Sequence, residues 1–185
     1  MIVIGASLGG MKALKSIVNT LPASFPLPIV AALHRHKESD DALLEVIQID
    51  TELPVSEVVD KEPILPGRVY IAPADYHLFV EREYFSLSTD DLVLFARPSI
   101  DVLFESAADS FGSAVIGVIL TGASPDGAKG AARIKQQGGR IIVQEPQSAD
   151  CAIMPEAALH AVQADYIRPL KEIGPLLQQL AIKPT

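Results

Sequence analysis

A serine set between glycines, at residues 5–10 (Gly-Ala-Ser-Leu-Gly-Gly), is the feature that most constrains this chain. The apolar run 1–4 precedes it, and residues 11–21 after it carry apolar side chains at helical spacing. The order is therefore a strand, a glycine-rich turn and a helix. A Gly-x-Ser-x-Gly turn in that setting exposes its hydroxyl beside a helix N-terminus, where backbone N–H groups can stabilise an oxyanion. The segment suggests a serine hydrolase, provided that a base and an orienting acid lie close to Ser7.

Strand and helix patterns alternate along the rest of the chain. This alternation predicts an α/β fold with a doubly wound, mostly parallel sheet (a Rossmann-like three-layer arrangement) and right-handed crossovers. Residues 78–81 and 85–88 predict one antiparallel β-hairpin. The other expected strands are 28–33, 54–59, 68–72, 114–120 and 140–144, and the expected helices are 40–49, 99–111 with Ser99 as N-cap, 128–137, 155–160 with Pro155 first, and 170–180 on the surface.

Composition narrows the class of protein. Length predicts one domain over residues 1–185. A net charge of −8 without a Lys/Arg cluster argues against nucleic acid and anionic membrane surfaces as partners. Apolar residues make up 49% of the chain and mean hydropathy is +0.28, yet no run reaches the ~18 residues of a membrane span, so no direct membrane insertion is expected. The single cysteine, Cys151, fits a reducing cytoplasm and is interpreted as a small buried filler.

Three residues with complementary chemistry each follow a predicted strand: Ser7, His34 and Asp126. In a doubly wound sheet the carboxyl ends of the parallel strands share one edge, and ligands bind there. A serine hydroxyl needs a base, an imidazole can take and return its proton, and a carboxylate orients the imidazole. The sequence therefore predicts a catalytic triad at this edge.

Each of these residues also has a plainer interpretation. Ser7 could cap the helix or bind a phosphate, and Asp126 could cap the helix that follows it. His36 could replace His34 as the base, because an extended segment points both side chains the same way. Further carboxylates stand in loops or at helix starts, and two further histidines are interpreted as ordinary surface residues: Asp75, Asp101 and Asp150, and His77 and His160.

Two familiar interpretations of a glycine-rich turn do not fit. The α/β-hydrolase fold places several strands before its nucleophile and orders the triad Ser, Asp/Glu, His. Here the nucleophile would be residue 7 and the order would be Ser7, His34, Asp126. A Gly-x-Gly-x-x-Gly dinucleotide fingerprint is also absent from residues 5–10.

Several sequence blocks follow one another along the chain: residues 4–10, His34, 65–73 (Leu-Pro-Gly-Arg-Val-Tyr-Ile-Ala-Pro), 97–104 (Arg-Pro-Ser-Ile-Asp-Val-Leu-Phe), 117–122, 126–127 and 154–155. In this order they resemble the catalytic domain of the chemotaxis protein-glutamate methylesterases of the CheB type. The resemblance runs from Ile2 to about Leu180.

The resemblance implies roles for these residues. Ser7 would be the nucleophile, His34 the base and Asp126 the orienting acid, with the backbone N–H of Ala123 in the oxyanion hole. The reaction implied is hydrolysis of γ-glutamyl methyl esters on the cytoplasmic helices of chemoreceptors, with glutamine deamidation in some members. The triad and oxyanion hole imply no metal and no organic cofactor.

The chain departs from the family pattern at three places. Leu8 replaces the usual threonine, the histidine block reads Leu-His-Arg-His over 33–36, and Ala123 replaces a methionine that contacts substrate. Arg97 is expected either to attract acidic receptor side chains or to pack under the hairpin. The family's receiver domain is not expected within residues 1–185, so activity is expected to be either unregulated or controlled by a separate receiver domain.

Leu8 and Ala123 motivate one alternative function, a methylesterase-like binding module that has lost turnover. Another alternative is a phosphate-binding α/β protein that uses the helix start at Gly9 and Gly10.

Overall fold

The computed structural model describes residues 1–34 and 43–182. Within them, seven strands form one parallel sheet in the order β3-β4-β2-β1-β7-β8-β9, and β5 and β6 form a separate antiparallel pair. The predicted doubly wound sheet with one hairpin is confirmed. The strands are β1 (Ile2–Ala6), β2 (Ile29–Leu33), β3 (Val55–Glu57), β4 (Val69–Ile71), β5 (His77–Val80), β6 (Phe85–Ser88), β7 (Ile116–Ile119), β8 (Arg140–Gln144) and β9 (Tyr166–Arg168).

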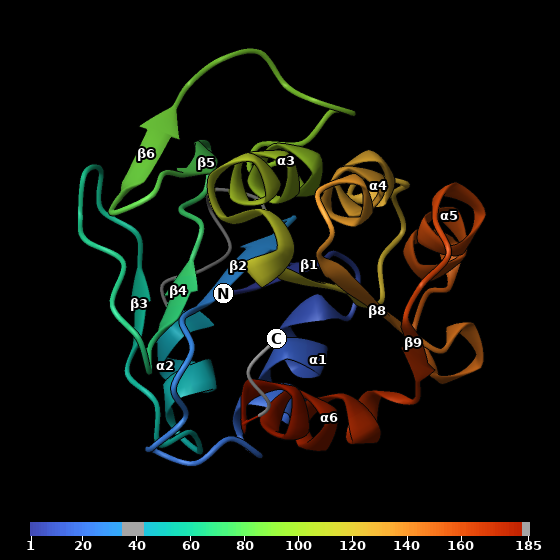
Figure 1. Ribbon diagram of the computed structural model, residues 1–185, viewed down its shortest axis with the longest axis horizontal. Coiled ribbons are helices and arrows are strands. Elements are labelled where there is room, and N and C mark those ends of the chain that lie inside the picture. The colour runs from blue at the N-terminus through green and yellow to red at the C-terminus, as the bar shows by residue number, and fades with distance from the viewer. Residues whose placement is uncertain (35–42, 183–185) are drawn as a thin grey trace.

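Helices cover both faces of this sheet (Figure 1). One face carries α1 (Gly10–Val18), α2 (Leu43–Gln48) and α6 (Leu170–Ile182), and the other carries α3 (Ile100–Phe111), α4 (Ala128–Gln136) and α5 (Ile153–Ala161). Short 3-10 turns lie at Gly112–Ala114 and Pro146–Ser148.

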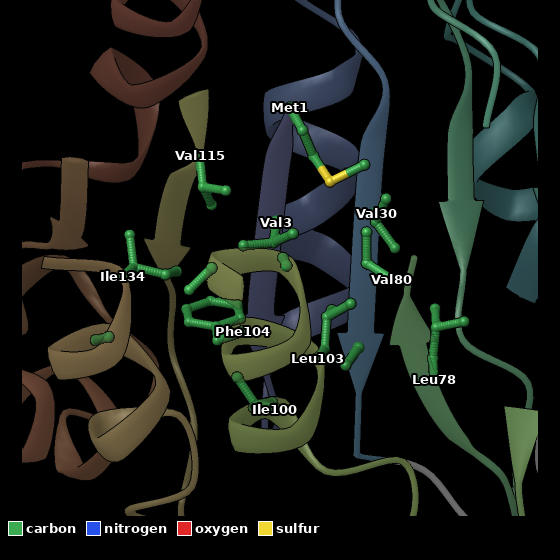
Figure 2. Close-up of a cluster of buried hydrophobic side chains, with 14 of the residues drawn as sticks. Met1, Val3, Val30, Leu78, Val80, Ile100, Leu103, Phe104, Val115 and Ile134 are labelled. Atoms are coloured by element: carbon green, nitrogen blue, oxygen red, sulfur yellow. The ribbon is translucent and has the colours of Figure 1, made fainter. Parts of the chain in front are cut away.

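Strand β1 is buried on both sides because its alternate residues face two separate cores. Ile2 and Ile4 pack into the core with α1, whereas Val3 packs into the core with α3 and α4. Figure 2 shows Val3 and Phe104 in this second core, with Ile100 at the end of α3 nearest the arrowheads of the parallel strands. Each fully buried large aliphatic side chain contributes about 1.5–3 kcal/mol to folding.

The strand order reverses at β1. Strands β2, β4 and β3 lie in that spatial order on one side of β1, and after β4 the chain crosses back to β7 on the other side. In doubly wound sheets a crevice opens at such a switch point, beyond the carboxyl ends of the strands. The residues that follow β1, β2 and β7 are therefore the ones the fold brings to a common edge.

Four details differ from the sequence-based expectations. The short and largely exposed strand β9 was not predicted, since three residues give no apolar run to detect. Helix α5 begins at Ile153, so Pro155 lies inside its first turn rather than at its first position. Helix α6 is not merely a surface helix, because Ile173 and Leu177 are fully buried. Strand β3 spans only Val55–Glu57, and residues 40–42 of the expected helix 40–49 lie outside the described residues.

Candidate functional site

Ser7 lies in the turn between β1 and α1, at the switch point. Its backbone N–H donates to Thr121 O after β7 (3.0 Å), and its carbonyl accepts from Gly10 N (2.8 Å). Gly9 adopts φ +80, in the left-handed region that a side chain disfavours, and so permits the tight turn into α1. The Ser7 hydroxyl makes no hydrogen bond to another described residue, and the side chain is half-buried. It is placed as an accessible nucleophile would be.

His34 stands next to Ser7 in the sheet register. Strands β1 and β2 pair in parallel up to Ala6 and Leu33, and His34 N donates to Ala6 O (3.1 Å). Neighbouring strands are about 4.8 Å apart, so the residues directly after Ala6 and Leu33 are neighbours. The His34 side chain is 14% exposed. His36, the alternative base, lies outside the described residues.

Asp126 is fully buried and contacts His34 directly. Its Oδ2 accepts from His34 Nε2 (2.8 Å) and from Ile100 N (2.7 Å). Its Oδ1 accepts from Ser99 Oγ (2.9 Å) and Asp101 N (3.0 Å). The carboxylate thus occupies the N-terminus of α3, where the helix dipole favours a negative charge. The plainer alternative, that Asp126 caps the following helix, does not hold, because its carboxylate accepts from the start of α3 instead.

The pKa of Asp126 reflects these contacts. Burial by itself would raise the pKa of this carboxyl group. The hydrogen bond from His34 and those from the backbone of Asp101 and Ile100 outweigh burial, so that the pKa lies below its ordinary value. Asp126 is therefore ionised at neutral pH and can support a positive charge on His34.

The contact with Asp126 engages one of the two ring nitrogens of His34. Nε2 is bonded to the carboxylate, so Nδ1 is the ring nitrogen that remains for a hydrogen bond with another group. The hydrogen bond between Ser7 and His34 is not formed in this structure, and such bonds often tighten only when substrate binds. The structure thus joins two of the three predicted side chains and sets the third beside them.

Gly122 brings a second loop against Ser7. A Cβ atom on Gly122 would lie 2.9 Å from Ser7 Cβ and 2.6 Å from Met154 Cε. Gly122 N donates to Cys151 O (3.1 Å), and Met154 N donates to Gly122 O (3.0 Å), so the loop is fixed from both sides. Only a residue without a side chain allows this approach.

Three backbone N–H groups in the two loops that meet at Ser7, those of Leu8, Gly9 and Ala123, lack a hydrogen-bond partner in the described part of the chain. Ala123 directly follows Gly122, and Leu8 and Gly9 open the turn before α1. N–H groups at such a helix start are suited to a developing oxyanion. Leu8 itself is 60% exposed and adds an apolar side chain to the rim of the site.

Thr121 is a buried connector that the sequence analysis did not single out. Its Oγ1 donates to Leu8 O (2.9 Å), lies 3.3 Å from Cys151 O, and accepts from Cys151 N (2.9 Å). Its backbone N–H donates to the buried Gln144 Oε1 (2.9 Å), and Gln144 Nε2 donates in turn to Ser148 O (2.9 Å). Cys151 is half-buried rather than a buried filler, and its backbone forms part of this network.

Arg97 holds the segment that leads into α3. Its Nη1 donates to Thr89 O (2.7 Å) and Asp90 O (2.9 Å), and its Nη2 lies 3.3 Å from Asp75 Oδ1. The side chain is 21% exposed. Two roles were expected for Arg97, packing under the hairpin or attracting acidic receptor side chains. The contacts observed here are of the first kind.

The other candidate residues take different places. His77 is buried, so the interpretation as a surface residue is wrong, whereas His160 is exposed. Asp101 is buried beside Asp126, and desolvation raises its pKa to about 6 against the opposing hydrogen bonds from Gly130 and Gly127. Asp150 is exposed and lies against Gly9.

No group of three or more His, Cys, Asp or Glu side chains in residues 1–34 and 43–182 is arranged to hold a metal ion. No helix in the same described residues is long and apolar enough to cross a membrane.

A doubly wound sheet with a nucleophile turn, an imidazole–carboxylate pair and unpaired backbone N–H groups at one edge is the arrangement of a serine hydrolase. The sequence matches the CheB methylesterase family over residues 2–177. The chain belongs to this family, and the resemblance seen in the sequence is confirmed.

Named relatives agree with this assignment. A putative protein-glutamate methylesterase/protein-glutamine glutaminase of Leptospira interrogans is 44% identical over 97% of this chain and 93% of its own length. The protein-glutamate methylesterase/protein-glutamine glutaminase of Thermotoga maritima is 36% identical, and the protein-glutamate methylesterase FrzG of Myxococcus xanthus is 38% identical. Both matches cover 97% of this chain, which spans about half of each relative (53% and 54%).

The fold agrees with a solved relative as well. The crystal structure of the Thermotoga maritima CheB methylesterase catalytic domain superposes with a TM-score of 0.94 at 36% identity, covering 97% of each chain.

Proposed function

We propose that this protein hydrolyses methyl esters on the glutamate side chains of chemoreceptors. Family membership and the names of the relatives support a carboxylic-ester hydrolase, and the hydrogen bond between His34 Nε2 and Asp126 Oδ2 supports the serine mechanism. Because the relatives are also named protein-glutamine glutaminases, the proposal includes deamidation of receptor glutamines by the same site.

The reaction begins with attack of Ser7 Oγ on the ester carbonyl while His34 Nδ1 removes the hydroxyl proton. Asp126 stabilises the imidazolium that forms. His34 then returns the proton to the methoxide leaving group, and methanol departs. A water molecule, deprotonated by His34, attacks the acyl-enzyme and releases glutamate and the Ser7 hydroxyl.

The negative charge on the carbonyl oxygen is held by backbone N–H groups in two places. Ala123 contributes one donor, and the turn after Ser7 contributes the others. Each donor is worth about 3 kcal/mol of transition-state stabilisation. Since these are main-chain groups, alanine in place of methionine at position 123 leaves the donor in place. The departures at Leu8 and Ala123, which motivated the alternative of a binding module without turnover, thus spare the proposed machinery.

The partners follow from the same proposal. The substrate is a methylated helix of a chemoreceptor's cytoplasmic region, and the reaction takes place in the cytoplasm. Leu8 and Ala123 line the rim that meets this helix. Control by a receiver domain, separate from residues 1–185, completes the proposal.

Ser7→Ala in purified protein tests the chemistry. The variant should release no methanol from methylated receptor, and a serine-reactive phosphonate should label only the wild-type protein, at Ser7. The side chain is half-buried and makes no hydrogen bond to a described residue, so the variant should unfold at the wild-type temperature. Undiminished methanol release by the folded variant would contradict the proposal, and a folded wild type that resists the phosphonate would favour the binding module.

A further inference from the structure

His77 is a buried histidine whose two ring nitrogens are both engaged by main-chain groups. It is 1% exposed and begins β5. Its Nδ1 lies 3.2 Å from Ser99 N, and its Nε2 lies 3.0 Å from Asp91 O. A backbone N–H can only donate and a carbonyl can only accept. The ring therefore carries its proton on Nε2, accepts from Ser99 at Nδ1 and donates to Asp91 at Nε2.

Ser99 connects this ring to the proposed triad acid. Its hydroxyl donates to Asp126 Oδ1 (2.9 Å), and the next two backbone N–H groups, of Ile100 and Asp101, donate to the same carboxylate. Three of the four hydrogen bonds to Asp126 thus come from residues 99–101. The first N–H of that segment is the one His77 accepts.

We propose that His77 is a positioning residue of this enzyme: by accepting the Ser99 N–H, it fixes the segment that aims the Asp126 carboxylate at His34. The inference rests on the proposed function, in which Asp126 orients the base. His77 touches neither substrate nor nucleophile in this proposal and acts only through Ser99.

The competing role for His77 is to anchor the loop between β6 and α3 through Asp91. That loop has another attachment, because Arg97 donates to the carbonyl groups of Thr89 and Asp90. Ser99, in contrast, is fully buried, and His77 is the acceptor for its N–H. Loss of the Nδ1 contact should therefore disturb the structure more than loss of the Nε2 contact.

Two substitutions separate the two contacts of the ring. In His77→Asn, the amide oxygen can occupy the position of Nδ1 and accept from Ser99, but nothing reaches Asp91. In His77→Gln, the amide nitrogen can occupy the position of Nε2 and donate to Asp91, but the Ser99 N–H loses its acceptor. The variants thus form a matched pair in which each keeps one hydrogen bond and removes the other.

Steady-state methanol release from methylated receptor is the first measurement. The Gln variant should lose about 10- to 100-fold in kcat with little change in KM, since a small misplacement of the catalytic geometry costs on this scale. The Asn variant should stay within about 3-fold of wild type in kcat. The reverse order, with Asn impaired and Gln active, or equal activity of both variants, would overturn the proposal.

The proton between His34 Nε2 and Asp126 gives a readout that does not need turnover. It should appear as a low-field imidazole N–H resonance in the NMR spectrum of the wild type and of His77→Asn, and broaden or disappear in His77→Gln. The wild-type protein could fail to release methanol and still show this resonance in wild type and His77→Asn but not in His77→Gln. That result would refute the proposed function and support the positioning role of His77. An active wild type whose resonance persists in His77→Gln would refute the inference alone. If His77→Gln does not fold, His77→Asn decides the question. A kcat and a resonance like those of the wild type in His77→Asn support the proposal, and the loss of either overturns it.

Discussion

Asp101, in α3, and Asp126, just before α4, exchange hydrogen bonds: each carboxylate accepts from the start of the helix that belongs to the other segment. Asp126, which precedes α4, takes the N–H groups of Ile100 and Asp101 in α3. Asp101, in the first turn of α3, takes the N–H groups of Gly127 (2.9 Å) and Gly130 (2.8 Å) at the start of α4. The exchange locks the two helix N-termini together at the edge of the sheet where the site lies. It satisfies helix donors that would otherwise be unpaired in a buried environment.

Asp101→Asn should change how stability depends on pH. Desolvation raises the pKa of Asp101 from 3.8 to about 6, so between these values the folded protein holds a proton that the unfolded chain releases. The unfolding free energy of wild type should therefore fall, relative to the variant, by about 2 kcal/mol as pH rises from 4 to 7. Asp126 is present in both proteins and its pKa is lowered by folding, so the stability it contributes is lost only as pH falls. Urea unfolding at several pH values measures the difference, and parallel curves for the two proteins would contradict the raised pKa.

Asp126→Asn should lower kcat by about 10³- to 10⁴-fold, the loss expected when an orienting carboxylate becomes an amide. Both oxygens of Asp126 accept hydrogen bonds, whereas an amide has only one acceptor oxygen. The amide nitrogen of the variant would therefore face a hydrogen-bond donor at the position of Oδ1 or of Oδ2. Asp109→Asn is the control, because Asp109 lies late in α3 and contacts only Arg133 among the described residues. Methanol release measures both variants. A loss of less than about 10-fold at Asp126 would remove it from the triad.

Gly122→Ala should inactivate the protein more than it destabilises it. The added methyl group would press on Ser7 Cβ and on the flexible end of Met154, so that the nucleophile must shift. Labelling of Ser7 by a phosphonate should slow by at least about 100-fold, as a displacement of about 1 Å implies. Gly112→Ala serves as the control, since its methyl group meets nothing closer than 3.8 Å and its φ of +54 carries only local strain. Equal labelling rates in the two variants would show that the approach of Gly122 does not constrain Ser7.

Thr121→Val should reduce both stability and activity, whereas Thr121→Ser should preserve most of each. Valine has nearly the shape of threonine but leaves Leu8 O and Cys151 N without the hydroxyl they contact. A buried group left unpaired costs about 1–3 kcal/mol. Chemical unfolding and phosphonate labelling measure the two effects. Wild-type values in the valine variant would mean that the hydroxyl does not fix the turn after Ser7.

Much of the site could be predicted from the sequence because each of its main residues follows an apolar strand. Ser7 directly follows residues 1–6 and His34 directly follows residues 28–33, and parallel strands bring such ends to one edge of the sheet. The N-cap at Ser99 could also be predicted from neighbouring residues alone, because a serine before an apolar stripe is a common helix start. The structure confirms it, since the Ser99 hydroxyl accepts from Val102 N.

The contacts around Asp126 could not be predicted in this way. His77 comes directly before the strand expected from the sequence at 78–81, and its sequence neighbours do not distinguish it from a surface histidine. It is buried because β5 lies under the segment that leads into α3, a contact between residues 22 positions apart. The hydrogen bonds from the start of α4 to Asp101 likewise depend on how α3 packs on α4. The sequence indicated only that Asp101 stands at the start of its own helix.

The sequence by itself determined the order of the strands and helices other than β9, the turn at Ser7 and the strand ends that reach one edge of the sheet, because these depend on local periodicity and on the rules of parallel connection. The tertiary structure decided which donors each carboxylate accepts, which nitrogen of His34 bonds to Asp126 and which glycine stands against Ser7. Such choices depend on side-chain packing between segments distant in the chain, and hydrogen bonds in a buried environment form only where that packing brings donor and acceptor within about 3 Å.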